Sequence, residues 1–140
     1  MVERSAADEK ENMIALLVLL LTFNIYEARV VRVIDGDTII TVVSVWIDLE
    51  QTAVIRIRGV DTPELKGKCE AEKNLAVRAK EFTASLLRDS KIKLSNVRND
   101  KFGGRYDADV ALGDGRSVAD LLVQAGLARK YFGGKRQGWC

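Results

Sequence analysis

Residues Val54–Glu64 read VIRIRGVDTPE. Up to the glycine, apolar and polar side chains alternate, which is the pattern of a strand with one face against a core. Arg56 and Arg58 share the polar side of this strand, and the turn that follows contains Asp61 and Glu64. The stretch therefore predicts a strand that carries two arginines into a carboxylate-rich turn.

A second run, IDGDT at Ile34–Thr38, ends another alternating segment and places Asp35 and Asp37 around a glycine. Carboxylates from two strand ends can gather around one hard cation. We therefore expect the two runs to meet in space. We interpret Asp35 as a residue that supports the turn rather than as a direct ligand.

The neighbouring patterns predict a meander, a helix, two further strands and a second helix. Strands are expected at Glu27–Ile34, Asp37–Ile47, Thr52–Arg58, Lys91–Val97 and Tyr106–Leu112, a polar turn at Asp48–Gln51, and helices at Glu70–Arg88 and from Ser117 to Gly126. This order predicts an α+β, mainly β fold: a five-stranded OB-fold barrel with one helix between strands 3 and 4 and one after strand 5. Periodicity leaves an open α+β sheet as the alternative.

The N-terminal part differs from the rest. A chain of 140 residues with 47% hydrophobic content predicts one domain with its own core. We assign residues 1–28 to an N-terminal extension and residues 29–140 to the folded domain. Residues 1–28 contain two basic and five acidic groups, which leaves 20 basic and 15 acidic groups elsewhere. This excess suits a polyanion weakly, because many soluble surfaces carry one.

Met13–Phe23, MIALLVLLLTF, is an unbroken apolar run of 11 residues. A membrane-spanning helix needs ~20 residues, so the run better fits the hydrophobic part of a secretory signal, which implies a periplasmic or secreted protein. Two features do not fit: the twelve preceding residues are net acidic, and Tyr26 is bulky for a cleavage site. The alternatives are an uncleaved membrane anchor through residues 13–25 and a buried core helix.

The residue types limit the chemistry. The chain has no histidine, which excludes imidazole as a base or a metal ligand. A general base contributes ~10²–10⁴-fold, whereas slow hydrolyses need on the order of 8–23 kcal/mol. Cleavage of a phosphodiester would therefore also require a cation and preset arginines. All-oxygen ligands favour a hard cation, with calcium ahead of magnesium.

The chain resembles the staphylococcal nuclease-like (thermonuclease) family, in particular its bacterial exported type. The resemblance runs from Val33 to Arg129 and is carried by IDGDT, by R-x-x-x-V-D-T-P-E from Arg56, by the DK-F-GG-R loop and by V-x-x-L-L-V-Q-A-G-L-A in the second helix. It implies a calcium-dependent nuclease on an OB-fold. It also implies that Asp37 and Asp61 bind calcium through their carboxylates and Thr62 through its backbone carbonyl.

The same resemblance implies the remaining roles. Glu64 would be the general base for the attacking water, and Arg56 and Arg105 would hold the scissile phosphate. Lys101 would lie near the substrate phosphates, and Tyr131 would stack on a base. The alternative for Arg56, Arg105 and Lys101 is that each is an ordinary solvated surface charge.

Some residues depart from the family pattern. Phe102 stands where the family often has tyrosine, and Gly103-Gly104 lengthens the loop before Arg105. Related exported nucleases share a G-x-C and G-W-C pair, which implies a disulfide between Cys69 and Cys140; two free thiols are the alternative.

Together these observations predict a monomeric, calcium-dependent nuclease. It would hydrolyse phosphodiester bonds of DNA and RNA, leave 3′-phosphate ends and need no stable protein partner. The alternative from another class is a non-catalytic OB-fold module that binds nucleic acid. A membrane-tethered interaction protein is a third interpretation.

Overall fold

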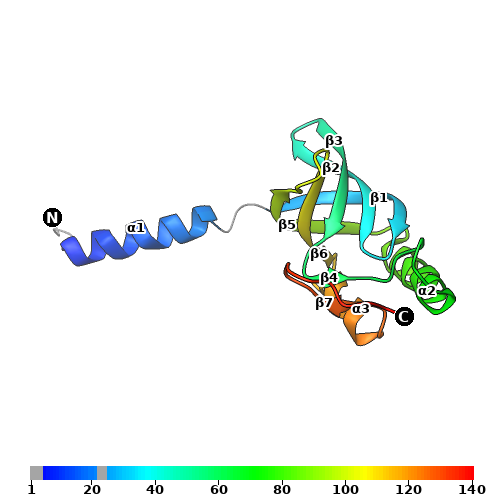
Figure 1. Ribbon diagram of the computed structural model, residues 1–140. Coiled ribbons are helices and arrows are strands. Elements are labelled where there is room, and N and C mark those ends of the chain that lie inside the picture. Colours follow the sequence, from blue (N-terminus) through cyan, green and yellow to red (C-terminus); the bar gives the residue numbers. More distant parts are fainter. Residues whose placement is uncertain (1–4, 22–24) are drawn as a thin grey trace.

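The computed structural model describes residues 5–21 and 25–140 (Figure 1). The first helix, α1 (Ala6–Leu21), contains most of the apolar run, but the end of that run lies outside the described residues. Met13, Ile14, Leu16 and Leu17 are all more than half exposed. The interpretation as a buried core helix is therefore wrong for these side chains. Within residues 5–21 and 25–140, no helix is long and apolar enough to cross a membrane.

Five strands close into a barrel in the order β1-β2-β3-β6-β5 (Figure 1). The strands are β1 (Tyr26–Asp35), β2 (Thr38–Trp46), β3 (Leu49–Ile57), β5 (Lys91–Asn99) and β6 (Arg105–Leu112). β3 and β6 run parallel, whereas the other neighbours are antiparallel. The α+β OB-fold barrel is confirmed, and the open sheet is wrong. The barrel begins at Tyr26, so residues 26–28 belong to it.

The alternating pattern of the strands places one apolar face inside the barrel. Ile39, Ile55, Ile57, Ile92 and Leu94 are at most 1% exposed. Each fully buried aliphatic side chain contributes about 1.5–3 kcal/mol relative to an exposed one. This interior holds the strand ends, where the two carboxylate runs lie, in fixed positions.

The turn between β2 and β3 is shorter than predicted. Trp46 pairs with Leu49 across a two-residue turn, so Glu50 and Gln51 belong to β3 rather than to a polar turn at Asp48–Gln51. Asp48 has a φ of 56°, a left-handed conformation that aspartate tolerates better than most residues. The polar side chains that suggested a longer turn lie instead on an exposed strand.

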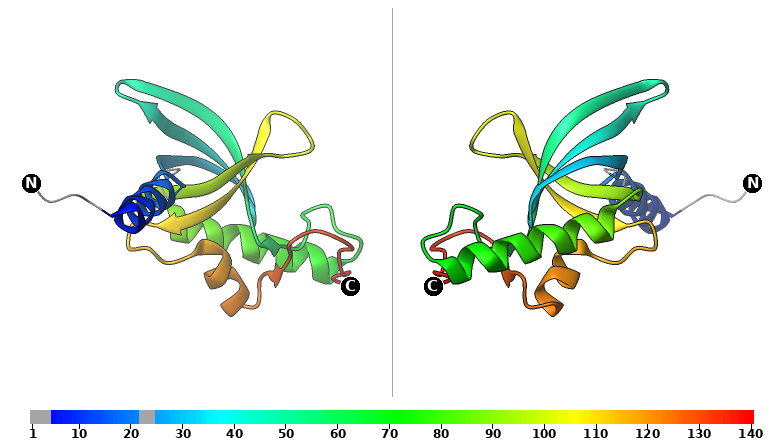
Figure 2. Two further views of the ribbon diagram at one scale, coloured as in Figure 1. Left: turned by 90° about the vertical axis from the view of Figure 1, so that its left-hand side faces the viewer. Right: turned by 90° about the vertical axis from the view of Figure 1, so that its right-hand side faces the viewer.

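Two helices lie against the barrel. Figure 2 shows α2 (Glu70–Leu87) beneath the strands and α3 (Val118–Gln124) beside it. The Cys69 sulfur accepts the Glu72 amide at the start of α2. Ser117 Oγ accepts the Asp120 amide at 3.3 Å and so caps the N-terminus of α3.

Helix α2 fixes the IDGDT turn. Thr83 Oγ1 donates to the carbonyl of Gly36 at 2.7 Å, and both groups are buried. A Cβ added to Gly36 would lie 2.8 Å from the Cβ of Ala79 and 3.0 Å from Thr62. This glycine is required because helix, turn and Thr62 approach one another so closely.

A pairing that the sequence pattern did not reveal joins β4 (Val60–Asp61) to β7 (Arg129–Lys130), with Asp61 opposite Arg129. The residues after β7 consequently run past the carboxylate-rich turn, and Figure 2 shows the two loops side by side. The C-terminal residues therefore become part of the surroundings of the site.

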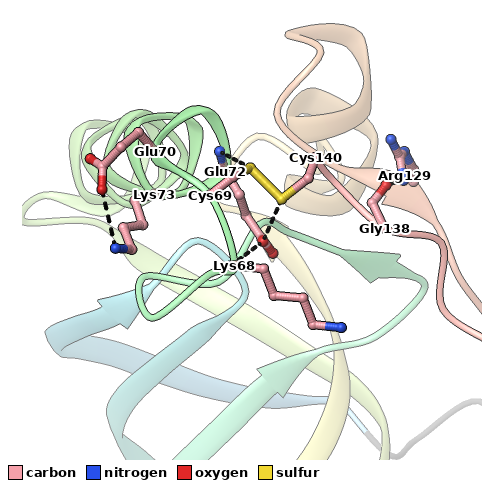
Figure 3. Close-up of a disulfide and its surroundings, with 8 residues drawn as sticks. All are labelled: Lys68, Cys69, Glu70, Glu72, Lys73, Arg129, Gly138 and Cys140. Atoms are coloured by element: carbon pink, nitrogen blue, oxygen red, sulfur yellow. Dashed lines mark hydrogen bonds and ion pairs between the residues drawn. A yellow bond between two sulfur atoms is a disulfide. The ribbon is translucent and has the colours of Figure 1, made fainter.

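Cys69 and Cys140 are joined in the structure (Figure 3). The bond connects the start of α2 to the end of the chain, across a sequence separation of 71 residues. Beside it, buried Glu72 accepts the Lys68 amide at 2.8 Å. The disulfide thus ties the C-terminal residues to the segment that leads from the turn into α2.

The formation of this bond in the purified protein is a prediction that thiol titration tests. Denatured but unreduced protein should show no reactive thiol, and two thiols would contradict the pairing. Reduction should lower the free energy of unfolding by about 4 kcal/mol, because the closed loop restricts the unfolded chain. Urea unfolding of the C69S/C140S variant, with and without reductant, is the control and should show no effect of the reductant.

Candidate active site

Asp37 joins the two carboxylate runs. Its side chain is buried beside β2, where Oδ1 accepts the Thr38 hydroxyl at 3.1 Å. Oδ2 accepts the backbone amide of Thr62 at 3.3 Å and lies 3.7 Å from Arg56 Nη2. The two runs therefore meet, as the sequence predicted.

Asp61 lies in the adjoining short strand and is only 5% exposed. Its Oδ1 forms an ion pair with Arg136 Nη2 at 2.9 Å, and no hydrogen bond to this oxygen is found within residues 5–21 and 25–140. Burial raises the pKa of Asp61, and the positive charge of Arg136 opposes that shift. A buried carboxylate oxygen that lacks a hydrogen bond is suited to binding a cation.

Asp35 supports the turn, since its Oδ1 accepts the amide of Asp37 at 3.1 Å. Burial, followed by the negative charge of Asp37, raises the pKa of Asp35 to about 6. Acidic groups are thus crowded at this end of the barrel. A divalent cation would relieve that crowding.

Glu64 differs from these residues because its side chain is 61% exposed. Its Oε1 accepts Arg136 Nη1 at 2.9 Å, and its carbonyl accepts the amide of Gly67 at 2.9 Å. The backbone of the turn is therefore closed on itself. The carboxylate faces solvent and is held on one side by a guanidinium.

The arginines of the site have different partners. Arg56 is largely buried, and its Nη2 donates to the carbonyl of Val60 at 3.2 Å. Arg58 lines the same cleft, but among the described residues it forms neither this hydrogen bond nor the ion pair with Asp37. Arg105 donates through Nε to Asp100 across the base of the glycine loop.

Phe102 organises the loop in place of a tyrosine. Its ring is 71% exposed, with Lys101 Nζ at 5.2 Å and Arg105 Cζ at 5.1 Å from its centroid. Cation–π attraction at exposed sites contributes about 0.5–1 kcal/mol. The lengthened loop places Arg105 on the cleft, and both cations lie close to the Phe102 ring.

One cleft of about 970 Å³ collects these groups. Asp61 is buried and is not among the lining residues of this cleft, although Thr62 and Glu64 are. Tyr131 lines the cleft and donates its hydroxyl to the carbonyl of Gly134 at 2.7 Å. The other predicted site residues on its surface are Asp37, Thr62, Arg56, Glu64, Lys101 and Arg105. A second cavity of about 460 Å³, at the barrel end near Tyr26, has Arg98 as its one charged lining residue and so lacks the carboxylates that a cation needs.

Residues 54–138 match the family model described as staphylococcal nuclease homologue. The chain belongs to this family. A search of curated proteins found no match. The matched residues of this nuclease homologue include Arg56, Asp61, Glu64 and Arg105, but the IDGDT run precedes them. The Asp37–Thr62 hydrogen bond is what places that run at the same site.

Oxygen donors fit a hard cation in this nuclease homologue. Asp37 and Asp61 are buried acidic groups, and in the described part of the chain Asp61 Oδ1 has an ion pair with Arg136 but no hydrogen bond. Cys69, Glu72 and Cys140 also gather potential ligand atoms within 4.8 Å of one another. Two sulfurs bonded to each other supply no thiolate, so that cluster does not fit a metal.

Sequence reasoning missed two charged residues of the site. Asp100 pairs with Arg105, and only its place at the start of the glycine loop could have suggested this. Arg136 reaches both Asp61 and Glu64 from the C-terminal stretch, where basic and aromatic residues follow no period. Arg136 lies four residues before Cys140, and the disulfide to Cys69 brings this part of the chain back to the start of α2. That disulfide was the one feature of the sequence that could have indicated Arg136.

Proposed function

We propose that this staphylococcal nuclease homologue is a monomeric, calcium-dependent nuclease that hydrolyses phosphodiester bonds of DNA and RNA and leaves 3′-phosphate ends. The observation that supports this proposal most directly is the hydrogen bond from the Thr62 amide to Asp37. It brings together carboxylates from two runs that are distant in the sequence. Arginines on two other elements and an exposed Glu64 line the same cleft. Family membership supports nucleic acid as the substrate.

Calcium would be held by Asp37, Asp61 and the carbonyl of Thr62. When bound, it would supply positive charge toward the oxygens of the scissile phosphate. Calcium accepts oxygen ligands in a flexible geometry, so two carboxylates and one carbonyl need not meet the strict octahedron that magnesium demands.

The chain's own residues supply the remaining chemistry. The Glu64 carboxylate would accept a proton from the attacking water, and in-line attack would expel the 5′-oxygen. Arg56 and Arg105 would donate hydrogen bonds to phosphate oxygens and stabilise the charge that develops there. Asp100 holds Arg105 through Nε, which leaves the Nη groups of that guanidinium for the substrate.

A non-catalytic OB-fold module that binds nucleic acid is the alternative. The basic and aromatic lining of the cleft, including Lys101, Phe102 and Tyr131, would favour binding of a single strand even without hydrolysis. Binding without cleavage in the presence of calcium would select this alternative.

Substitution of Glu64 by glutamine should lower kcat on single-stranded DNA by at least about 10²-fold, because the base is lost while the shape is kept. Chelation of divalent ions should abolish cleavage by the wild-type protein. Product 3′ ends should resist polymerase extension until they are treated with a phosphatase.

Glu70→Gln is the matched control for this substitution. Glu70 is 83% exposed and pairs with Lys73 on α2. Its loss should leave kcat unchanged. Wild-type activity in E64Q, or wild-type cleavage that persists after chelation, would rule out the mechanism.

Calcium should stabilise the protein whether or not the substrate is cleaved. At a concentration 100 times its Kd, a ligand that binds only the folded state adds about 2.7 kcal/mol to the free energy of unfolding. Thermal unfolding with calcium or with chelator measures this gain. Asp61→Asn should remove most of it, whereas Asp114→Asn, in an exposed turn, should retain it. An equal Tm with and without calcium in the wild type would argue against this site.

We also propose that the protein is exported to the periplasm or secreted, and that the apolar run serves as its signal. The alternative is that residues 13–25 persist as a membrane anchor. Intact mass of the protein from the producing cells distinguishes the two: the mature chain should lack the run. A full-length mass in the membrane fraction would instead identify an anchor.

A further inference from the structure

The C-terminal tail, which we define as Tyr131–Cys140, is fixed at both ends. At its start, the Tyr131 amide donates to the carbonyl of Gly59 at 2.9 Å, continuing the pairing of β4 with β7. At its end, Cys140 is bonded to Cys69 (Figure 3). The tail is therefore a closed loop over the turn that contains Asp61 and Glu64.

Arg129 provides a further attachment near the end of the tail. Its guanidinium lies 3.9 Å from the centroid of the Trp139 ring, and Nη1 donates to the carbonyl of Gly138 at 2.8 Å. Gly133 and Gly134 have φ values of 108° and 88°, which let the tail reverse direction. Between these fixed points, the tail presents Arg136 to the site.

The Arg136 guanidinium contacts two acidic residues of the turn at once. Nη2 lies 2.9 Å from Asp61 Oδ1, and Nη1 donates to Glu64 Oε1 at 2.9 Å. Asp61 is buried, whereas Glu64 is mostly exposed. Arg136 meets each carboxylate through one oxygen, Oδ1 of Asp61 and Oε1 of Glu64.

We propose that Arg136 is a positioning residue that holds the Asp61–Glu64 turn, and that the Cys69–Cys140 disulfide keeps it in place. The proposal deepens the nuclease function and in its kinetic part rests on it. Reduction of the disulfide would then act on the site through the tail, without any change in the barrel.

The planar guanidinium explains why arginine is needed here. Its nitrogens form a rigid fork that can engage two acceptors in one plane, whereas a lysine ammonium is a single compact charge. An exposed glutamate without such a partner keeps most of its rotamer freedom, and ordering it costs side-chain entropy. By fixing Glu64 to buried Asp61, Arg136 would meet that cost before substrate binds.

A direct contact between Arg136 and substrate phosphate is the rival interpretation. It predicts a higher KM and a weaker salt dependence in the variant, with kcat retained. Positioning predicts the opposite: a lower kcat with a similar KM, and a looser turn even when neither metal nor substrate is present.

Amide hydrogen exchange on the full-length, metal-free protein is the primary test. Exchange of the Gly67 amide, which donates to Glu64, should be roughly 10-fold faster in R136A and in reduced wild-type protein. R116A is the matched control, because Arg116 pairs with Asp114 in an exposed turn away from the cleft. It should leave Gly67 unchanged. Wild-type exchange of Gly67 in R136A would overturn the proposal.

Kinetics provides the second test. R136A should lose roughly 10–100-fold in kcat, as is typical when a partner that orients a functional group is removed. R136K should not restore the rate. Reductant should slow the wild type but leave R136A unaffected, because both changes remove the same restraint. A rise in KM alone, or equal sensitivity of both proteins to reductant, would count against positioning.

The two tests separate this proposal from the nuclease assignment. If the protein cleaves nothing, the exchange of Gly67 still shows whether Arg136 and the disulfide restrain the turn. If it cleaves nucleic acid but the turn is unchanged in R136A, the nuclease assignment stands and the positioning role fails.

Discussion

The hydrogen bond between the Thr62 amide and Asp37 is the contact on which the site depends. It joins a strand end near residue 37 to Thr62, which lies 25 positions later in the following turn. Two features make it geometrically feasible. The barrel aligns the ends of β1, β2 and β3, and α2 fixes the IDGDT turn through the Thr83 bond to Gly36. A side chain at position 36 would clash with Ala79 and Thr62. The close approach of α2 and Thr62 to the IDGDT turn therefore requires glycine at this position.

The arrangement also concentrates negative charge, which a folded protein must offset. Burial of an unpaired charge costs several kcal/mol, and Asp37 and Asp61 are both buried. The structure places Arg56 near the first and Arg136 near the second. These arginines reduce the repulsion but do not remove it, because the pKa of Asp35 is still raised to about 6 by burial and by Asp37. Crowded acidic groups with perturbed pKa values are common at functional sites.

The barrel was predictable because its strands obey one simple rule. Side chains of β2 and of the second half of β3 alternate between buried and more exposed positions, and β-branched residues suit both strands. The gathering of Asp37, Thr62, Glu64 and Arg105 could be predicted only from motif spacing and resemblance. Arg136 obeys no such rule, since its position comes from a two-residue strand, two glycines with positive φ and a disulfide. The shorter β2–β3 turn was missed for a related reason: polar Glu50 and Gln51 resemble a turn in sequence, although they pair as a strand.

The C-terminal tail contributes Arg136 to a site whose other residues lie much earlier in the chain. The family match ends at residue 138, so it includes Arg136 but not Cys140. A loop with positive-φ glycines and a mostly exposed surface has little packing energy of its own to hold one conformation. Its order must come from its attachments, namely the pairing with β4, the Arg129–Trp139 contact and the disulfide. Only the disulfide depends on the redox environment. An oxidising compartment would therefore stabilise the fold and also complete the charge arrangement around Asp61 and Glu64, which connects the proposed export of the protein to the geometry of its site.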